Sequence, residues 1–274
     1  MNKLSVERRS QIVSALVEGN SIRSTCRMTG AAKGTVIRLL NNVGAACSAY
    51  QNNVMNNLNC KKVQCDEIWS FCYSKQKNVP ESKRDEYGVG DVWTWVAIDA
   101  DTRLVPCWVV GDRSAEFAHA FMYDLKSRLT NRIQLTTDGY KTYLEAVEDA
   151  FGADIDYAML VKLYGKTYHQ DTRYSPPPCI GTDTRVKQGK PDTTQISTSY
   201  VERQNLTMRM HMRRFTRLTN AFSKKIANLE HAVALHFMYY NFCKVHIGLK
   251  TTPAIAAGVS EQKWEISDIV NLIN

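Results

Sequence analysis

The order of strand-like and helix-like segments between residues 62 and 165 constrains the fold of this chain most. Apolar and polar side chains alternate in "KKVQCDEIWSFCY", and two further β-rich runs in "DVWTWVAIDADTRLVPCWVVGD" are joined by a hairpin at "DADTR". Helix-like and strand-like segments then alternate, in the order helix 114–129, strand 132–140, helix 141–152 and strand 155–165. Leading hairpin strands favour antiparallel pairing, and strands separated by helices favour parallel pairing. The order therefore predicts an α/β fold with a mixed five-stranded sheet and flanking helices.

The first 45 residues predict a separate arrangement of three short helices, over 5–19, 20–30 and 31–44. A tight turn at Gly30 joins the second and third helices, which is typical of a helix-turn-helix. Lys33, Thr35 and Arg38 would then project from the third helix into a DNA major groove. A plain three-helix bundle is the alternative.

The charge distribution indicates a polyanionic partner. The net charge is +8, and residues 160–225 hold 13 Lys and Arg against 4 Asp and Glu. The first 45 residues hold 7 against 2. Two basic zones favour nucleic acid as the partner, although a solvated basic face is the alternative. Charges throughout the first residues argue against a secretory signal, and we expect a cytoplasmic protein.

Three carboxylates stand where a metal site could form. Asp66 lies in the middle of the first strand, Asp138 ends the fourth strand, and Glu202 opens the helix expected over 197–215. Asp is rare inside strands, and the carboxyl edge of parallel strands is where ligands bind. Clustered carboxylates repel each other unless a hard cation compensates them, which favours Mg²⁺ or Mn²⁺. Two such ions can cleave a phosphodiester.

Each carboxylate also has an ordinary explanation. Asp138 before Gly139 is typical of a turn, Glu202 suits the first turn of a helix, and Asp66 could be solvated, with Glu67 as a rival ligand. The joint arrangement is what favours a metal site.

The helix after residue 197 combines an acid with a basic face. At 3.6 residues per turn, Glu202, Arg209 and Arg213 share one face, and arginine is suited to phosphate. A second face is apolar and should pack on the core; it comprises Val201, Met208, Met212 and Phe215.

The stretches "CDEIW", "TTDGY" and "YVERQNLTMRMHMRRF", in this order, resemble the DDE transposases of bacterial insertion sequences, and in particular the IS-one-like family. The resemblance covers about residues 60–258. It implies a ribonuclease H-like core with Asp66, Asp138 and Glu202 as the catalytic, metal-binding triad for two Mg²⁺ (or Mn²⁺) ions. It also implies DNA-binding roles on the helix that begins near Glu202, which we assign to Asn205, Arg209, Arg213 and Arg214. For Asn205 the alternative is a role in supporting the metal ligands. Asp183 and Asp192 are the alternatives to Glu202.

The resemblance implies a transposase that cleaves double-stranded DNA at transposon ends and transfers the 3′-OH into target DNA. We expect a homodimer or larger assembly on DNA, associated with the nucleoid. The expected organisation is a helix-turn-helix domain (1–45), a linker (46–60), a catalytic domain (61–219) with an insertion loop (165–196), and a helical extension (220–274). A catalytically inactive DNA-binding regulator and a ribonuclease H-like nuclease are the alternatives.

Overall fold

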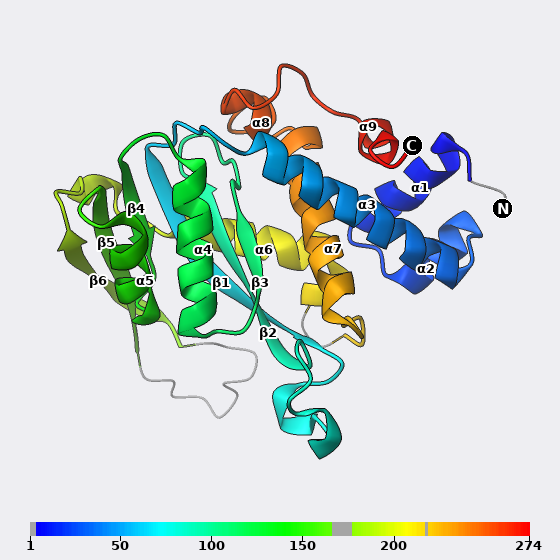
Figure 1. Cartoon of the computed structure of the whole chain (residues 1–274), viewed down its shortest axis with the longest axis horizontal. Helices are drawn as coiled ribbons and strands as arrows, with labels where there is room; N and C mark the ends of the chain where they lie inside the picture. Colours follow the sequence, from blue (N-terminus) through cyan, green and yellow to red (C-terminus); the bar gives the residue numbers. More distant parts are fainter. Residues whose placement is uncertain (1–3, 166–176, 217–218) are drawn as a thin grey trace.

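A mixed β-sheet lies at the centre of the protein, whose structure is a computed structural model that describes residues 4–165, 177–216 and 219–274. The sheet has six strands in the order β3-β2-β1-β4-β5-β6 (Figure 1). The strands are β1 (Lys62–Cys72), β2 (Gly90–Asp99), β3 (Trp108–Gly111), β4 (Ile133–Thr137), β5 (Ile155–Tyr164) and β6 (Cys179–Gln188).

The strand directions follow the connections. β2 runs antiparallel to both β1 and β3, and the connections between these three strands contain no α-helix in the described structure. β4 runs parallel to β1 and to β5, since helices separate these strands along the chain. The expected α/β fold with a mixed sheet and this succession of antiparallel and parallel strands is confirmed.

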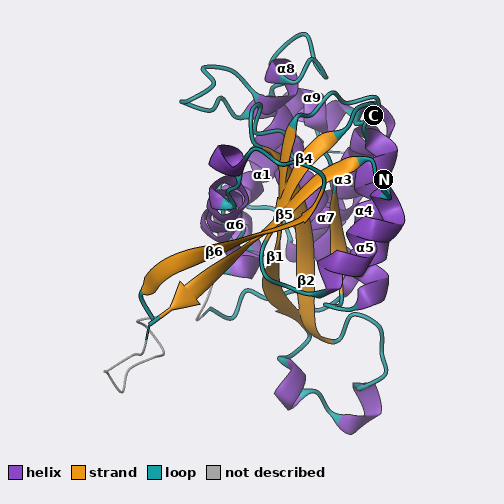
Figure 2. Ribbon diagram, turned by 90° about the vertical axis from the view of Figure 1, so that its left-hand side faces the viewer, coloured by secondary structure: helices purple, strands orange, loops and turns teal. Residues whose placement is uncertain are grey.

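The sixth strand corrects the prediction of a five-stranded sheet, and it corrects the irregular loop predicted over 165–196 in the part from 179 to 188. Residues 166–176 of that predicted loop lie outside the described residues. β6 pairs antiparallel with β5, and the two strands extend away from the helices (Figure 2). Its apolar and β-branched side chains do alternate, from Ile180 to Val186, but most of the strand is exposed. A strand without a buried face lacks the hydrophobic run that marks strands in a sequence, and its backbone pairing with β5 forms it instead.

Helices cover both faces of the sheet. On one face lie α4 (Ala115–Arg128) and α5 (Thr142–Phe151), and on the other lies α6 (Ser199–His211) (Figure 1). The face that α6 covers has its own apolar core, in which Ile68 of β1 meets side chains of α6 and of the turn that follows it. The predicted apolar face of this segment is confirmed, because Val201, Met208, Met212 and Phe215 are all buried. The helix itself ends at His211, earlier than predicted, and Arg213–Phe215 form a 3₁₀ turn.

The three predicted N-terminal helices are present as α1 (Val6–Val17), α2 (Ile22–Thr29) and α3 (Lys33–Val54). Gly30 ends α2 in the left-handed conformation, with φ of 66°, which glycine adopts without strain. However, α3 continues to Val54, through most of the segment expected to be a linker over 46–60. Its buried residues Val43 and Cys47 recur at helical spacing, which keeps this polar, Asn-rich segment helical.

The C-terminal helices pack on the N-terminal ones. α3 lies against α7 (Ile226–Met238), and α1 lies against α9 (Ile266–Asn271), while α8 (Pro253–Ala256) follows a π-helical turn at Tyr239–Cys243. At Gly44, α3 and α7 approach so closely that a Cβ on this residue would overlap the backbone of His231. Gln51 also donates a hydrogen bond of 3.1 Å to the carbonyl oxygen of Ala234. The two ends of the chain therefore form one helical layer beside the sheet. None of the helices that the structure describes is long and apolar enough to cross a bilayer.

Candidate active site

The pairing register of β1 and β4 brings Asp66 beside Asp138. Cys65 of β1 is paired with Thr137, the last residue of β4. The residue that follows each of these two is an aspartate, Asp66 after Cys65 and Asp138 after Thr137. Asp138 is held by its own loop, because its carboxylate accepts a hydrogen bond of 2.9 Å from the amide of Tyr140. Parallel strands thus place two carboxylates, distant in sequence, at one edge of the sheet.

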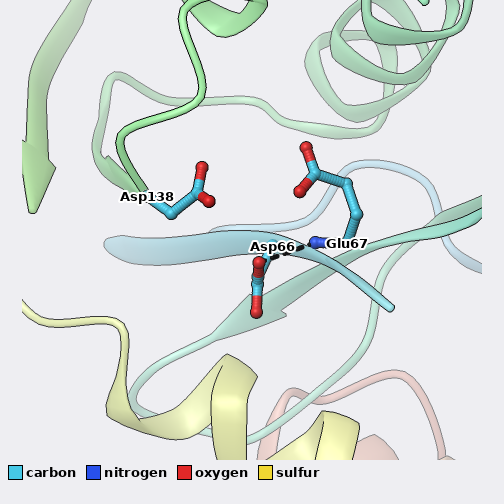
Figure 3. A group of neighbouring side chains, drawn as sticks. All are labelled: Asp66, Glu67 and Asp138. Carbon is cyan, nitrogen blue, oxygen red and sulfur yellow. Dashed lines mark hydrogen bonds between the residues drawn. The ribbon is translucent and has the colours of Figure 1, made fainter. Parts of the chain in front are cut away.

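Glu67 joins these two aspartates. Among the described residues, Asp66, Glu67 and Asp138 form a group in which one carboxylate oxygen of each residue lies within 4.8 Å of those of the other two. Asp66 points toward α6, and Glu67 points to the opposite side of β1 (Figure 3). The Glu67 side chain is only 1% exposed, so it faces the protein interior rather than solvent.

Glu202 approaches the same site from α6, which is anchored on β1. The side-chain oxygen of Gln64 accepts hydrogen bonds from the amides of Tyr200 (2.8 Å) and Val201 (3.2 Å), so β1 itself caps the first turn of the helix. One turn further on, the side-chain nitrogen (Nδ2) of Asn205 donates a hydrogen bond of 2.8 Å to the carboxylate of Asp66. Asn205 is only 8% exposed. These contacts hold the start of α6 over Asp66.

The carboxylate oxygens of Glu202 are both engaged by neighbours. The hydroxyl of Thr198 donates to one oxygen at 2.6 Å, and the ammonium of Lys162, on β5, lies 2.5 Å from the other. Glu202 is not one of the three carboxylates, Asp66, Glu67 and Asp138, whose ligand oxygens lie within 4.8 Å of one another. Its charge still contributes to raising the pKa values of Asp66 and Asp138.

The carboxylates of the site are buried close together, and the positive charge around them is too small to keep their pKa values in the usual range. Burial, followed by the charge of Asp138, raises the pKa of Asp66 to about 7. Burial and the charge of Asp138 likewise raise the pKa of Glu67 to about 8, although Arg113 opposes the shift. Burial also raises the pKa of Asp138. A cation placed here would stabilise the ionised carboxylates.

Arg113 is the cation that the protein itself supplies beside the aspartates. Its guanidinium lies 3.5 Å from Glu67 and 4.0 Å from Asp138. It is held between aromatic rings, 4.6 Å from the ring centre of Trp93 and 4.0 Å from that of Tyr140. This packing fixes a positive charge at the edge of the site.

The donor set fits a hard divalent cation. The converging ligand atoms of Asp66, Glu67 and Asp138 are carboxylate oxygens, the ligands that Mg²⁺ and Mn²⁺ prefer. Glu202 could join them if its ion pair with Lys162 opened. A pKa of about 7 means that Asp66 is only partly ionised at neutral pH without such a charge, and burial raises the pKa of Asp138 in the same direction.

The arginines expected on α6 divide into different environments. Arg213 is exposed in the 3₁₀ turn, while Arg209 is half-buried, with a contact of 3.5 Å to the carbonyl oxygen of Phe215. Arg214 donates a hydrogen bond of 2.8 Å to Ser223, and burial lowers its pKa to about 10. The predicted common face of Glu202, Arg209 and Arg213 is therefore broken, because the helix ends before Arg213.

The residues singled out on the third N-terminal helix stand at its start. Lys33 and Arg38 of α3 are exposed, and Thr35 is half-buried. The turn from Gly30 to Ala32 separates α3 from α2. Both cations are available to a partner, far along the chain from the carboxylates.

Sequence reasoning missed Gln64, Arg113 and Lys162. Gln64 and Lys162 look like ordinary polar positions of strands, and Arg113 precedes a helix without any distinguishing pattern. Their roles depend on which element of the fold packs against each of them, and the residues next to them in sequence do not indicate this. Glu67 did have a signal, since it adjoins Asp66 in a strand.

We expect the Lys162→Met protein to bind Mn²⁺ about two- to fivefold more tightly than the wild type. Removing the ammonium frees one oxygen of Glu202 and leaves the site more negative, and a partly exposed ion pair of this kind contributes up to about 1 kcal/mol. Titration of free Mn²⁺ by electron paramagnetic resonance measures the affinity. Lys126→Met is the matched control, since Lys126 pairs with Asp154 on the other side of the sheet. Equal affinities of both variants would show that Lys162 does not compete with the metal.

Metal affinity should fall at least about tenfold between pH 8 and pH 6. A raised pKa of about 7 means that the Asp66 carboxyl holds its proton at pH 6 and has lost it at pH 8, and metal binds the ionised form. The same Mn²⁺ titration, repeated at each pH, measures the change. A flat profile over this range would contradict a carboxylate of raised pKa among the ligands.

No known family model and no curated protein sequence matches this chain. Among solved structures, the chain is similar to a piggyBac transposase in a synaptic complex with hairpin DNA. The identity is 10%, the TM-score is 0.40, and the match covers 98% of this chain and 69% of that chain. A similarity at this level establishes neither family nor activity.

Proposed function

We propose that the chain is a DDE-type DNA transposase that cleaves DNA at transposon ends and transfers the resulting 3′-OH into target DNA. The observation that supports it best is the convergence of Asp66, Asp138 and the start of α6, which carries Glu202, at one edge of the sheet. Acids in this arrangement suit two-metal cleavage of phosphodiesters. The ordered stretches that resemble bacterial insertion-sequence transposases support the same reaction.

The three acids would hold Mg²⁺ or Mn²⁺, which supplies activation of the attacking oxygen and stabilisation of the leaving oxygen. Asn205 would keep the Asp66 carboxylate in place through its hydrogen bond. Lys162 would release Glu202 and would then be free to contact a DNA phosphate. Arg113 would hold Asp138 and limit the repulsion among the acids.

The N-terminal helices would recognise the transposon ends. α2, the turn at Gly30 and α3 would act as a helix-turn-helix, with Lys33, Thr35 and Arg38 near the DNA. Arg209 and Arg213 would contact the strand that is cut. Two DNA ends must be brought together for insertion, so we propose a homodimer or larger assembly on DNA.

The test is a cleavage assay on a plasmid that carries the gene with several hundred base pairs of its natural flanks. Purified full-length protein is incubated with Mg²⁺, with Mn²⁺ or with EDTA, and new 3′-OH ends are mapped. We expect metal-dependent nicks at the element boundaries. Tight binding without nicks under any metal would favour the inactive regulator, and cleavage without boundary preference or strand transfer would favour a nuclease.

A further inference from the structure

A second, basic site lies at the far end of α6 from Glu202. Here α1, α2 and α3 face the end of α6 and the first turns of α7 across a cavity of about 780 Å³. Its walls carry four exposed cations, which are Arg23, Lys33, Arg213 and Lys224. None of the described residues that line the cavity is Asp or Glu.

These cations have no acidic partners of their own. Within the described part of the chain, no carboxylate oxygen lies within 4.0 Å of any of the four. Lys224 instead lies over the ring of Phe222, 4.2 Å from its centre. A cluster of unneutralised cations around a concave surface attracts an anion strongly.

Helix N-termini add to the positive potential. Lys33 is the first residue of α3, and Lys224 precedes α7, while Ser21 caps α2, and all three residues line the cavity. Neither α3 nor α7 has a side-chain cap, so amides of their first turns remain available to a ligand. His236 also lines the cavity at 4% exposure, and its Nδ1 has no hydrogen-bond partner among the described residues.

The remaining walls are apolar, which narrows the chemistry of the ligand. Leu16, Ile37 and Leu235 stand beside the cations. A phosphate beside the flat face of an unstacked base matches cations next to an apolar wall. Proteins that bind single-stranded nucleic acid combine a basic groove with contacts to the faces of the bases in the same way, although their platforms are aromatic and this wall is aliphatic. The volume is that of a small-ligand pocket, which is too small to enclose a base-paired duplex.

We propose that this cavity binds a single-stranded segment of DNA, with its phosphates on Arg23, Arg213 and Lys224 and an unstacked base against the apolar wall. That the nucleic acid is DNA rests on the proposed function. α6 has 13 residues, so it spans about 20 Å from the carboxylates to the cavity. A strand that leaves the cavity along α6 would therefore reach the catalytic acids.

The test measures the binding of fluorescein-labelled dT8, and of a duplex of the same length, to the full-length protein by fluorescence anisotropy in EDTA. We expect Arg23→Ala/Lys224→Ala to bind dT8 at least tenfold more weakly at low salt. The slope of log K against log salt should become shallower by about 1.4, since two phosphate contacts are lost. Binding of the duplex should change less.

Lys126→Ala/Lys263→Ala is the matched control, because it removes the same charge from two lysines paired with acids elsewhere. Asn228→Trp fills the cavity without changing the charge and should also weaken dT8 binding. Equal losses in the cavity and control variants, or equal losses for dT8 and duplex, would overturn the proposal. Because EDTA prevents cleavage, this result is independent of the nicking assay, and a protein that binds dT8 here without nicking DNA would refute only the proposed function.

Discussion

We expect the Asp66→Asn protein to lose metal-dependent DNA nicking by at least about 10³-fold while becoming more stable to heat. Loss of nicking follows because the variant lacks a carboxylate that would hold the metal, and removal of one essential group costs about this much in comparable hydrolases. Binding to DNA in EDTA should not change, since Asp66 lies at the metal site rather than on a basic surface.

The gain in stability follows from the raised pKa. The Asp66 carboxyl titrates at about 7 in the folded protein, whereas an unfolded aspartate titrates near 4. As the pH rises from 4 to 7, ionisation therefore favours the unfolded state progressively, and above pH 7 the full cost remains. Asparagine removes this cost and can keep the contact with Asn205, so the free energy of unfolding at pH 8 should rise by about 1 kcal/mol.

Calorimetry at pH 8 without metal should show a midpoint about 2–4 °C higher for Asp66→Asn. Asp85→Asn is the control, since Asp85 is exposed in the β1–β2 connection. A lower midpoint for Asp66→Asn would mean that the carboxylate stabilises the metal-free fold. Nicking at the wild-type rate would remove Asp66 from the proposed triad.

The second large effect concerns the third acid. Glu202→Gln should lower nicking by at least about 10²-fold, whereas Asp192→Asn and Asp183→Asn should cut at close to the wild-type rate. Asp192 lies in a surface turn, where it accepts hydrogen bonds from Thr194, and Asp183 pairs with Arg185 on the exposed β6. The charge of Glu202 contributes to the raised pKa values of Asp66 and Asp138, whereas neither Asp183 nor Asp192 is among the causes of these shifts.

Rates of strand nicking on the plasmid with its natural flanks, measured at saturating Mn²⁺, decide between these acids. Gln keeps the size of Glu202 and the hydrogen bond from Thr198, so a loss would report the missing charge. Full activity of Glu202→Gln together with loss in Asp192→Asn would move the third ligand to the β6 side of the sheet.

Strands with one buried face were predictable, and the exposed strand was not. β1, β2 and β4 show the apolar alternation or apolar runs that burial imposes, so their order could be read directly. β6 exists because β5 offers it an unpaired edge, and its alternating apolar and β-branched side chains are exposed rather than buried. The end of α3 was misjudged for a related reason, since α7 buries one face of an Asn-rich segment.

The proximity of Asp66 and Asp138 could be expected for carboxylates on parallel strands, although only Asp138 follows the end of its strand. Asp66 lies in the middle of β1, just beyond the point where the parallel pairing of β1 with β4 ends. The surroundings of these acids could not, because they depend on contacts across large separations in sequence. Gln64 reaches the start of α6, and Lys162 pairs with Glu202, over 136 and 40 positions respectively. Patterns within one element contain no information about such partners.

The sequence by itself determined the succession of helices and strands, the antiparallel and parallel pairing that follows from it, and the position of two aspartates at one sheet edge. These depend on local periodicity and on short connections. The tertiary structure alone decided that Glu202 is held by Lys162, that Arg113 stands between Glu67 and Asp138, and that the N-terminal helices and the end of α6 enclose a basic cavity. Each of these arises where separate elements pack, and packing partners are set by the whole fold rather than by neighbouring residues.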